Sequence, residues 1–326
     1  MLRIVAVALL LLVSGKGSAF AQEYLGTAVS AAMGEAMADP RYQTLLAKYG
    51  LPMPDISGDA ILASPARNAY PARSGGTLLN QVLDRGKIRI GWIRVGIPFS
   101  FVGKDGKLQG LAIDLWPLIL EKLSAKYGAH IEPVWVEFTS ETGNNEMYRQ
   151  LASDQDLDCA ARGLASPDMC YDIIGGAYAF NEPRKKVSAL TAAYYPLNMS
   201  VVRTAVPLKD RNGKDIPTDT PEAIFAAAKN PDASVTFAAL AATGESQFLD
   251  ELKKRFGGET FKVVVRPADS NILEFAQKTE AHFVLGTNAR IYFTRTQTPQ
   301  FCADCNVVTN LLKFDGVGFA TALPKK

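Results

Sequence analysis

The chain is poor in the residues on which most catalytic and metal sites depend. Among 326 residues only two are histidine and four are cysteine. His130 stands just before one expected strand and His282 begins another, and neither has a partner at a spacing typical of acid–base catalysis. There is also no G-x-S-x-G motif, no phosphate-binding loop and no cluster of metal ligands. We therefore expect a protein that is not an enzyme and that holds no cofactor or metal.

An excess of charge of either sign is also missing. Lys plus Arg number 35 and Asp plus Glu number 33, and two of the basic residues, Arg3 and Lys16, lie in the first 21 positions. The rest of the chain is therefore near neutral and has no basic block with interleaved aromatic residues for nucleic acid. After residue 21 no run is long and apolar enough to span a bilayer. We expect no nucleic-acid partner.

A short apolar run does lie at the N-terminus. Met1-Leu2-Arg3 precedes the apolar stretch from Ile4 to Val13, and Ala19-Phe20-Ala21 forms an A-x-A pattern. A charged start, a short hydrophobic core and a small-residue cleavage site indicate a secretory signal peptide. No cysteine follows Ala21 directly to carry a lipid anchor. We expect cleavage near Ala21 and export of the remaining chain.

The four cysteines of an exported chain indicate disulfides. They are Cys159, Cys170, Cys302 and Cys305. Proximity favours the pairs 159–170 and 302–305, although four cysteines allow three pairings. The wide spacing of the first pair disfavours a zinc site. The second pair is expected in a loop before a strand, which disfavours a redox role.

Residues 84–123 are the most informative stretch. Lys87 to Trp92 alternates polar and apolar residues, which is typical of a strand. Pro98-Phe99 turns the chain, and Lys104 to Lys107 has the Asp-Gly sequence of a tight turn. From Asp114 apolar residues recur at helical spacing, with Asp114 placed to cap the helix. Further along, expected strands at 131–138, 235–240 and 262–266 alternate with helices at 221–229, 247–256 and 270–278. This alternation predicts an α/β fold.

The ordered motifs resemble the opening of a family 3 periplasmic solute-binding protein. Its Gly-Lys-Leu-Arg-Val-Gly, Pro-Phe-Ser-Phe, Asp-Gly-Lys, Gly and Asp-Leu elements stand here as Gly86 to Gly91, Pro98 to Phe101, Asp105 to Lys107, Gly110 and Asp114-Leu115. Gly175 to Tyr195 resembles a later stretch of the family, with Asn181 replacing the Thr of its Thr-x-x-Arg motif. The resemblance implies an α/β, two-lobed periplasmic-binding-protein-like fold of type II, in which each lobe is a mixed sheet flanked by helices.

Residues 23–52 are expected to be helical, and Ala38 to Leu51 resembles the segment that ends family members. We interpret this as a circular permutation that places the closing helices first; the alternative is an unrelated helical extension. The expected parts are a signal peptide (1–21), helices packing on lobe 1 (22–52), a linker (53–77), lobe 1 (78–197), lobe 2 (198–313) and a return strand to lobe 1 (314–326).

The resemblance places a ligand in the cleft between the lobes. Arg184 takes the position of the motif arginine, whose guanidinium fork binds a ligand carboxylate in amino-acid-binding relatives. Thr243 would offer its hydroxyl and helix N-terminal amides to the same group. The other expected ligand residues are Trp92, Arg94, Phe99, Gly176, Ala177 and Asn288. The alternatives are a solvated Arg184, a core role for Trp92 and a simple helix cap at Thr243.

The function that the resemblance implies is capture of a small polar solute, amino-acid-like or an organic anion. Relatives offer an acidic residue to the ligand ammonium where this chain has Gly286-Thr287-Asn288, which favours an organic anion or a modified amino compound. The expected partner is an ABC-type permease in the inner membrane, with a monomeric protein in the periplasm. Alternatives are an accessory or sensory binding protein that docks on a receptor or envelope enzyme, and an enzyme similar to cyclohexadienyl dehydratases, with Glu182 as its best carboxylate candidate.

Overall fold

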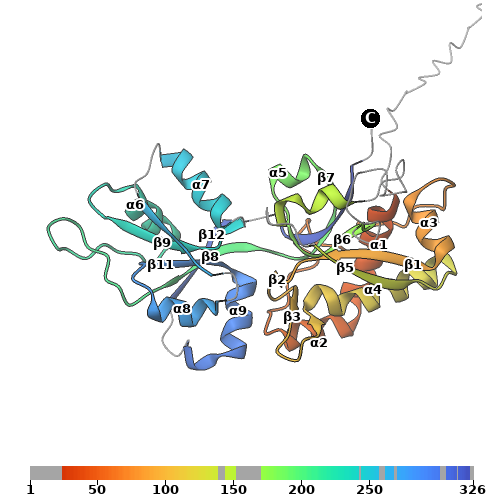
Figure 1. The fold of residues 1–326 in the computed structure, drawn as a ribbon, viewed down its shortest axis with the longest axis horizontal. Coiled ribbons are helices and arrows are strands. Elements are labelled where there is room, and N and C mark those ends of the chain that lie inside the picture. Colours follow the sequence, from red (N-terminus) through yellow and green to blue (C-terminus); the bar gives the residue numbers. More distant parts are fainter. Residues whose placement is uncertain are drawn as a thin grey trace, which may run out of the picture.

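The computed structural model describes residues 24–138, 144–151, 170–241, 244–256, 261–267, 270–301, 306–313 and 315–323. These residues form two lobes that lie side by side (Figure 1). The chain passes between the lobes twice, from β7 (Ser188–Tyr195) to β8 (Asn198–Arg203) and from β12 (Asn306–Lys313) to β13 (Val317–Ala322). No helix in this described part of the chain combines the length and the apolar character that a membrane span requires.

Lobe 1 is built on a mixed five-stranded sheet in the order β5-β1-β6-β13-β7. β1 runs parallel to β5 and β6, whereas β13 is antiparallel to both β6 and β7. Its other described elements are α3 (Leu78–Arg85), β1 (Lys87–Trp92), β2 (Val95–Gly96), β3 (Ser100–Val102), β4 (Leu108–Gln109), α4 (Leu111–Tyr127), β5 (Glu132–Glu137), a 3-10 turn (Asn144–Gln150), β6 (Ile173–Ala179) and α5 (Glu182–Lys185).

Lobe 2 repeats the architecture with the sheet order β10-β9-β11-β8-β12. β9 is parallel to β10 and β11, and β8 is antiparallel to β11 and β12. Its other described elements are α6 (Pro221–Lys229), β9 (Val235–Ala239), α7 (Gly244–Phe256), β10 (Phe261–Val265), α8 (Ile272–Lys278), β11 (Phe283–Thr287), α9 (Asn288–Gln297) and a 3-10 turn (Pro299–Phe301). The predicted fold class is confirmed, because each lobe is a mixed sheet flanked by helices.

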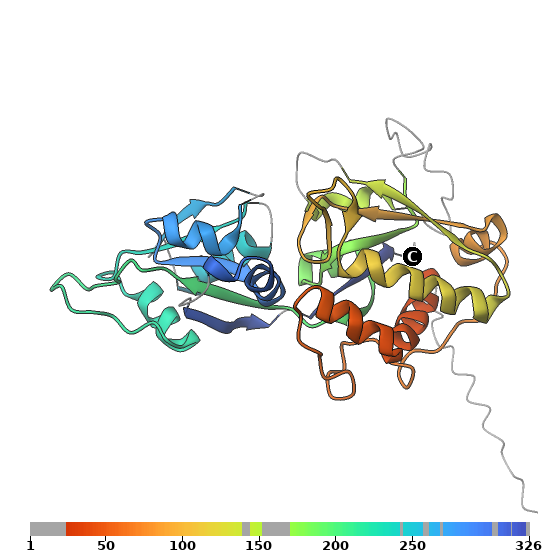
Figure 2. The ribbon, with the colours of Figure 1, turned by 90° about the horizontal axis from the view of Figure 1, so that it is seen from below.

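The first two helices, α1 (Tyr24–Ala38) and α2 (Pro40–Lys48), pack on lobe 1 beside α4 (Figure 2). α1 is buried on nearly all sides, as expected of a helix that is apolar all round. A Cβ on Gly34 would lie 2.7 Å from the backbone of Ser64, so the segment after α2 crosses directly over α1. Within that segment Ala63 and Ile61 pair with Ala193 of β7.

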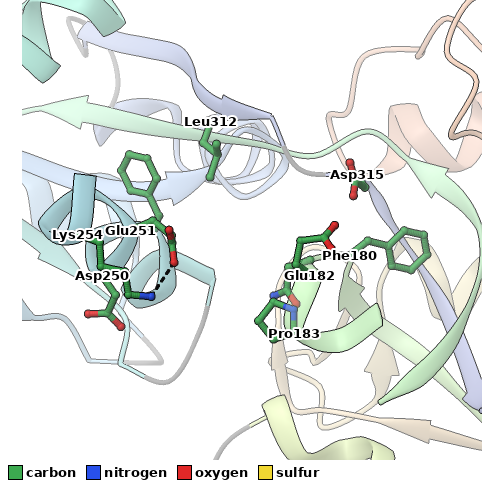
Figure 3. A pocket seen from close by; sticks show the side chains of 10 residues that line it. Phe180, Glu182, Pro183, Asp250, Glu251, Lys254, Leu312 and Asp315 are labelled. Carbon is green, nitrogen blue, oxygen red and sulfur yellow. Dashed lines mark hydrogen bonds and ion pairs between the residues drawn. The ribbon is translucent and has the colours of Figure 1, made fainter. Parts of the chain in front are cut away.

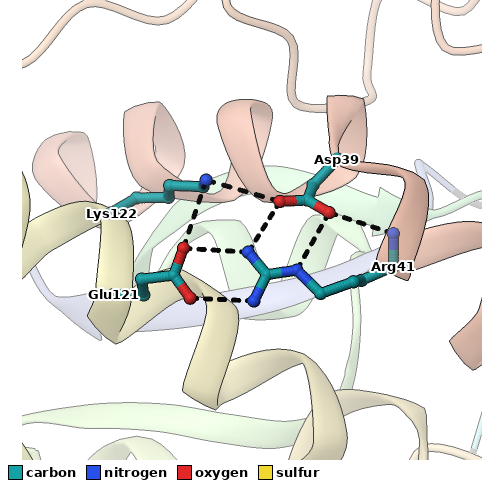
Figure 4. Close-up of polar contacts among 4 residues, drawn as sticks. All are labelled: Asp39, Arg41, Glu121 and Lys122. Atoms are coloured by element: carbon teal, nitrogen blue, oxygen red, sulfur yellow. Dashed lines mark hydrogen bonds and ion pairs between the residues drawn. The ribbon is translucent and has the colours of Figure 1, made fainter.

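Four charged side chains join the corner between α1 and α2 to α4 (Figure 4). Asp39 caps α2 by accepting a hydrogen bond from the Arg41 N–H, and its carboxylate also binds the Arg41 guanidinium. The same guanidinium donates two bonds of 2.8 Å to Glu121 on α4. Lys122 lies 3.4 Å from both carboxylates. The N-terminal helices are therefore fastened to lobe 1 by a network as well as by apolar packing.

The helix predicted to begin at Asp114 begins three residues earlier, at Leu111. Gly110 precedes it at φ 137°, a conformation that favours glycine, and supplies no side-chain cap. Asp114 instead accepts hydrogen bonds from Tyr49 Oη and Lys48 Nζ, both at 2.6 Å. The predicted capping role is thus wrong, although the carboxylate still lies in the first turn, where it opposes the helix dipole.

Candidate ligand site between the lobes

A cavity of about 570 Å³ lies between the two lobes (Figure 3). Both lobes and the second crossing segment contribute to its walls. The lining residues are Phe180, Asn181, Glu182 and Pro183 of lobe 1, Phe248, Asp250, Glu251 and Lys254 of lobe 2, and Leu312 and Asp315 where the chain returns to lobe 1. A cavity of this size, lined from two lobes, fits a small-molecule ligand.

The lobe 1 wall is a turn that the local sequence specifies. The extended residue Asn181 follows β6, and its Oδ1 accepts a hydrogen bond of 2.9 Å from the Arg184 N–H. Asparagine is among the best helix caps, so it replaces the expected threonine without loss of the turn. Pro183 lies in the first turn of α5, where a missing N–H costs nothing. The cap therefore fixes Glu182 and Pro183 at the cavity wall.

The lobe 2 wall is the exposed face of α7. Hydrogen bonds of the buried residue Glu245 hold the start of this helix. Glu245 is 4% exposed and its carboxylate accepts hydrogen bonds from the Leu240 N–H at 2.7 Å and from Arg266 at 2.9 and 3.1 Å. A buried ion pair with this many hydrogen bonds orients the elements that carry it. Phe248 is also buried. Asp250, Glu251 and Lys254 of the same helix contribute to the cavity lining.

The charge of the lining is mainly negative. Figure 3 shows Glu182 and Asp315 on one side of the cavity and Asp250 and Glu251 on the other. Lys254 is the basic residue of the lining, and its Nζ lies 2.9 Å from Glu251. Lys185, beside the lining, binds both lobe 1 carboxylates. Four carboxylates with Phe180, Phe248, Pro183 and Leu312 suit a ligand that has a cationic group and an apolar part.

Arg184 lies directly behind the cavity wall and is 4% exposed. Its guanidinium carbon lies 4.3 Å from the centre of the Tyr178 ring, and Nη1 donates a 2.7 Å hydrogen bond to Ala179 O. Burial lowers the pKa of this guanidinium. In this structure the side chain therefore supports the wall that Glu182 and Pro183 form. Whether it also binds ligand stays a prediction.

Two of the predicted aromatic ligand residues are packed within lobe 1. Trp92 is 6% exposed, at the end of β1. Phe99 is 3% exposed and contacts the rings of Tyr194 and Tyr195. Arg94 is exposed, and it binds Glu137 through two hydrogen bonds of 2.8 and 2.7 Å. None of the three lines the described cavity.

The remaining predicted residues are also placed by packing. A Cβ on Gly176 would come within 2.8 Å of Ser100 Oγ, so close packing disfavours a larger residue there. Ala177 lies against Gly96, whose added Cβ would meet it at 2.5 Å. Asn288 accepts a 3.0 Å hydrogen bond from the Asn198 N–H and so holds the start of β8. Thr243 lies outside the described residues. Their ligand roles stay predictions.

Neither histidine lines the cavity. His130 lies 3.4 Å from Glu132 on the surface of lobe 1. His282 Nδ1 accepts a hydrogen bond from the Thr236 N–H at 3.1 Å, and burial lowers its pKa. The described residues contain no group of three or more side chains that could hold a metal ion.

Of the four cysteines only Cys170 lies among the described residues. It is fully buried, directly before Tyr171 and β6, and it is disulfide-bonded. Cys159, Cys302 and Cys305 lie outside the described residues, so the predicted pairing stays a prediction.

Sequence reasoning missed most of the cavity lining. Glu182 was considered, but Asp250, Glu251, Lys254 and Asp315 were not. The periodicity of α7 does show which face is polar. It does not show that this face meets the other lobe, because that depends on how the two bodies are joined.

No protein-family model matches this chain, and no curated protein matches it. Solved structures with a similar arrangement include holo ArgBP from T. maritima, which is 18% identical over 74% of this chain and 85% of that one, with a TM-score of 0.45. Another is AncCDT-1, an ancestral amino acid-binding protein and precursor of cyclohexadienyl dehydratase, at 18% identity, 75% and 85% coverage and a TM-score of 0.47. An ancestral arginine-binding protein bound to arginine is 20% identical over 73% and 85%, with a TM-score of 0.44.

Proposed function

We propose that this chain is a solute-binding protein that captures a small molecule between its lobes. The observation that carries the proposal is the cavity, because its lining comes from both lobes and from a crossing segment. Rotation of one lobe against the other would close such a cavity around a ligand. This arrangement needs no catalytic group, since binding and release are its only steps.

The charge of the lining supports a solute with a cationic group. Four carboxylates line the space; Lys254 is paired with one of them and Lys185 with two, so negative charge still predominates. An anionic ligand without a cationic group would have to approach these carboxylates and would be repelled. Of the two solute classes expected from the sequence, an amino-acid-like compound is therefore favoured over an organic anion. Arg184, one residue beyond the wall, remains the proposed partner for a ligand carboxylate.

The proposed cellular role is delivery of the solute to an ABC-type permease of the inner membrane by a monomeric protein in the periplasm. The N-terminal sequence pattern and the motif resemblance support it. An accessory or sensory binding protein would use the same cavity. For the enzymatic alternative, Glu182 does line the cavity, but it is 75% exposed and paired with Lys185. The lining includes no histidine to complete an acid–base pair.

A thermal-shift screen tests the proposal. The panel contains L-arginine, L-lysine and putrescine as cations, neutral amino acids, and succinate as an anion. A ligand that binds the native state raises the melting temperature by mass action. We expect hits among the cations, and we expect Asp250→Asn to weaken binding of the best one several-fold. Glu280→Gln is the matched control, because it removes an exposed carboxylate of lobe 2 that does not line the cavity.

Two results would contradict the proposal. Succinate as the strongest hit would reverse the assignment of solute charge. Equal affinities for the wild type and Asp250→Asn would place the ligand elsewhere. If no compound of the panel raises the melting temperature, the protein does not bind solutes of these classes. That result would favour the accessory role.

A further inference from the structure

The lobes touch at a second place, away from the cavity. In Figure 1, α5 and α7 face each other on one side of the crossing strands, whereas α9 lies beside β3 and α2 on the other. Three aromatic rings meet there. Phe293 of α9 lies 5.5 Å from Phe101 and 6.2 Å from Tyr49, measured between ring centres, and these two rings of lobe 1 lie 6.4 Å apart.

The backbone of lobe 1 also comes very close to α9 at this place. Gly50 has φ 63°, and an added Cβ would lie 1.9 Å from Thr296 Oγ1 and 2.6 Å from Thr296 Cβ. Only a residue without a side chain allows this approach. The helix pair at the start of the chain therefore ends in direct contact with lobe 2.

Each side of the ring contact belongs to a segment that is hydrogen-bonded within its own lobe. Tyr49 is 2% exposed, and its Oη donates to Asp114 and accepts a 2.9 Å hydrogen bond from the Gly110 N–H. On the other side, Asn288 at the start of α9 binds the Asn198 N–H where the first crossing strand begins. α9 is thus tied to the crossing strand at its start and to lobe 1 near its end.

We propose that Phe293 is a positioning residue and that its contact with Tyr49 and Phe101 is the pivot about which the lobes turn. The rings stay in contact while α7 approaches α5. The cavity, which lies on the other side of the crossing strands from the rings, closes in this movement. The pivot restricts the lobes to orientations that lead to closure. Without it the ligand-free protein spreads over more orientations, and apparent affinity falls in proportion to the binding-competent fraction.

Spin labels test the pivot without any ligand, so the result does not depend on the proposed solute. Exposed Lys87 of β1 and Lys229 of α6 are replaced by cysteine and labelled, one in each lobe. The expected result is a clearly broader distribution of label distances for Phe293→Ala than for the wild type. Phe293→Leu, which keeps part of the contact, should lie between them.

Phe275→Ala is the matched control, because this partly buried phenylalanine of α8 packs within lobe 2. Both alanine variants lose the same side chain, and only Phe293→Ala should broaden the distribution. Equal distributions for Phe293→Ala and the wild type would overturn the proposal. A narrower distribution that is shifted to the label distances of a closed cavity would also overturn the proposal. The ring contact would then oppose closure and would have to break before the lobes could close.

Discussion

Asn181 illustrates at the residue scale how one side chain can replace another without changing a turn. The motif that the chain resembles has threonine there, and both residues can accept a hydrogen bond from a helix N–H. Here Asn181 Oδ1 caps α5 and so fixes the wall of the cavity. The departure from the motif does not imply a different turn.

Replacing Asn181 with alanine should lower the free energy of unfolding by about 1 kcal/mol, because the cap is lost. Asn181→Thr should stay within a few tenths of the wild type, since threonine can make the same bond. Urea denaturation of the two variants measures the difference. Equal losses for alanine and threonine would show that the cap contributes nothing at this turn.

The sequence predicts where a residue lies along the chain better than it predicts which residues surround its side chain. The position of Arg184 after β6 follows from the motif, and the structure places it in α5, buried behind the cavity wall. Its contact with Tyr178 could not be predicted, because the ring direction depends on packing of the whole lobe. The resemblance places Gly176 where a glycine lets the backbone approach a ligand closely. In the structure a Cβ added to Gly176 would first meet Ser100 Oγ, from a segment far away in the sequence.

At the scale of elements, local patterns predicted most helices and strands well. α6 spans Pro221–Lys229 as predicted, because Thr220 caps it and Pro221 can begin a helix. The start of α4 was misplaced, since Gly110 begins it without a side-chain cap. Residues Asn144 to Gln150 form a 3-10 turn, which the sequence analysis does not predict. Short 3-10 segments lack the periodicity on which sequence reasoning relies.

The stabilisation that the Arg41 network gives to the packing of α2 on α4 should decrease at low pH. Hydrogen bonds from Arg41 lower the pKa of Glu121 to about 2 and hold that of Asp39 well below its ordinary range. A carboxyl whose folded pKa is depressed stabilises the fold fully above its unfolded pKa of about 4. That stabilisation is lost as the pH falls from about 4 toward 2.

The comparison of the wild type with Arg41→Met isolates this effect. Their difference in unfolding free energy should be equal at pH 7 and pH 5 and smaller at pH 3. Urea denaturation at the three values measures it. A difference that does not change between pH 5 and pH 3 would mean that the Arg41 network does not set the two pKa values.

At the scale of the whole molecule, the sequence predicted two lobes and could not predict how they face each other. Each lobe follows from strands and helices that alternate along the chain. The cavity and the ring contact of Phe293 depend on the relative placement of residues such as Glu182 and Asp250, which no local pattern encodes. α1 and α2 pack on lobe 1 beside α4, the arrangement that a circular permutation requires. The permutation itself remains our interpretation.

Small-angle X-ray scattering of the full chain with and without the best cation of the panel is the most direct test of capture between the lobes. We predict that saturating ligand lowers the radius of gyration of the wild type, because the lobes close on the cavity. At a ligand concentration that half-saturates the wild type, Asp250→Asn should be compacted less. Tight binding with an unchanged radius of gyration would contradict the account, because the solute would then be held without the second lobe.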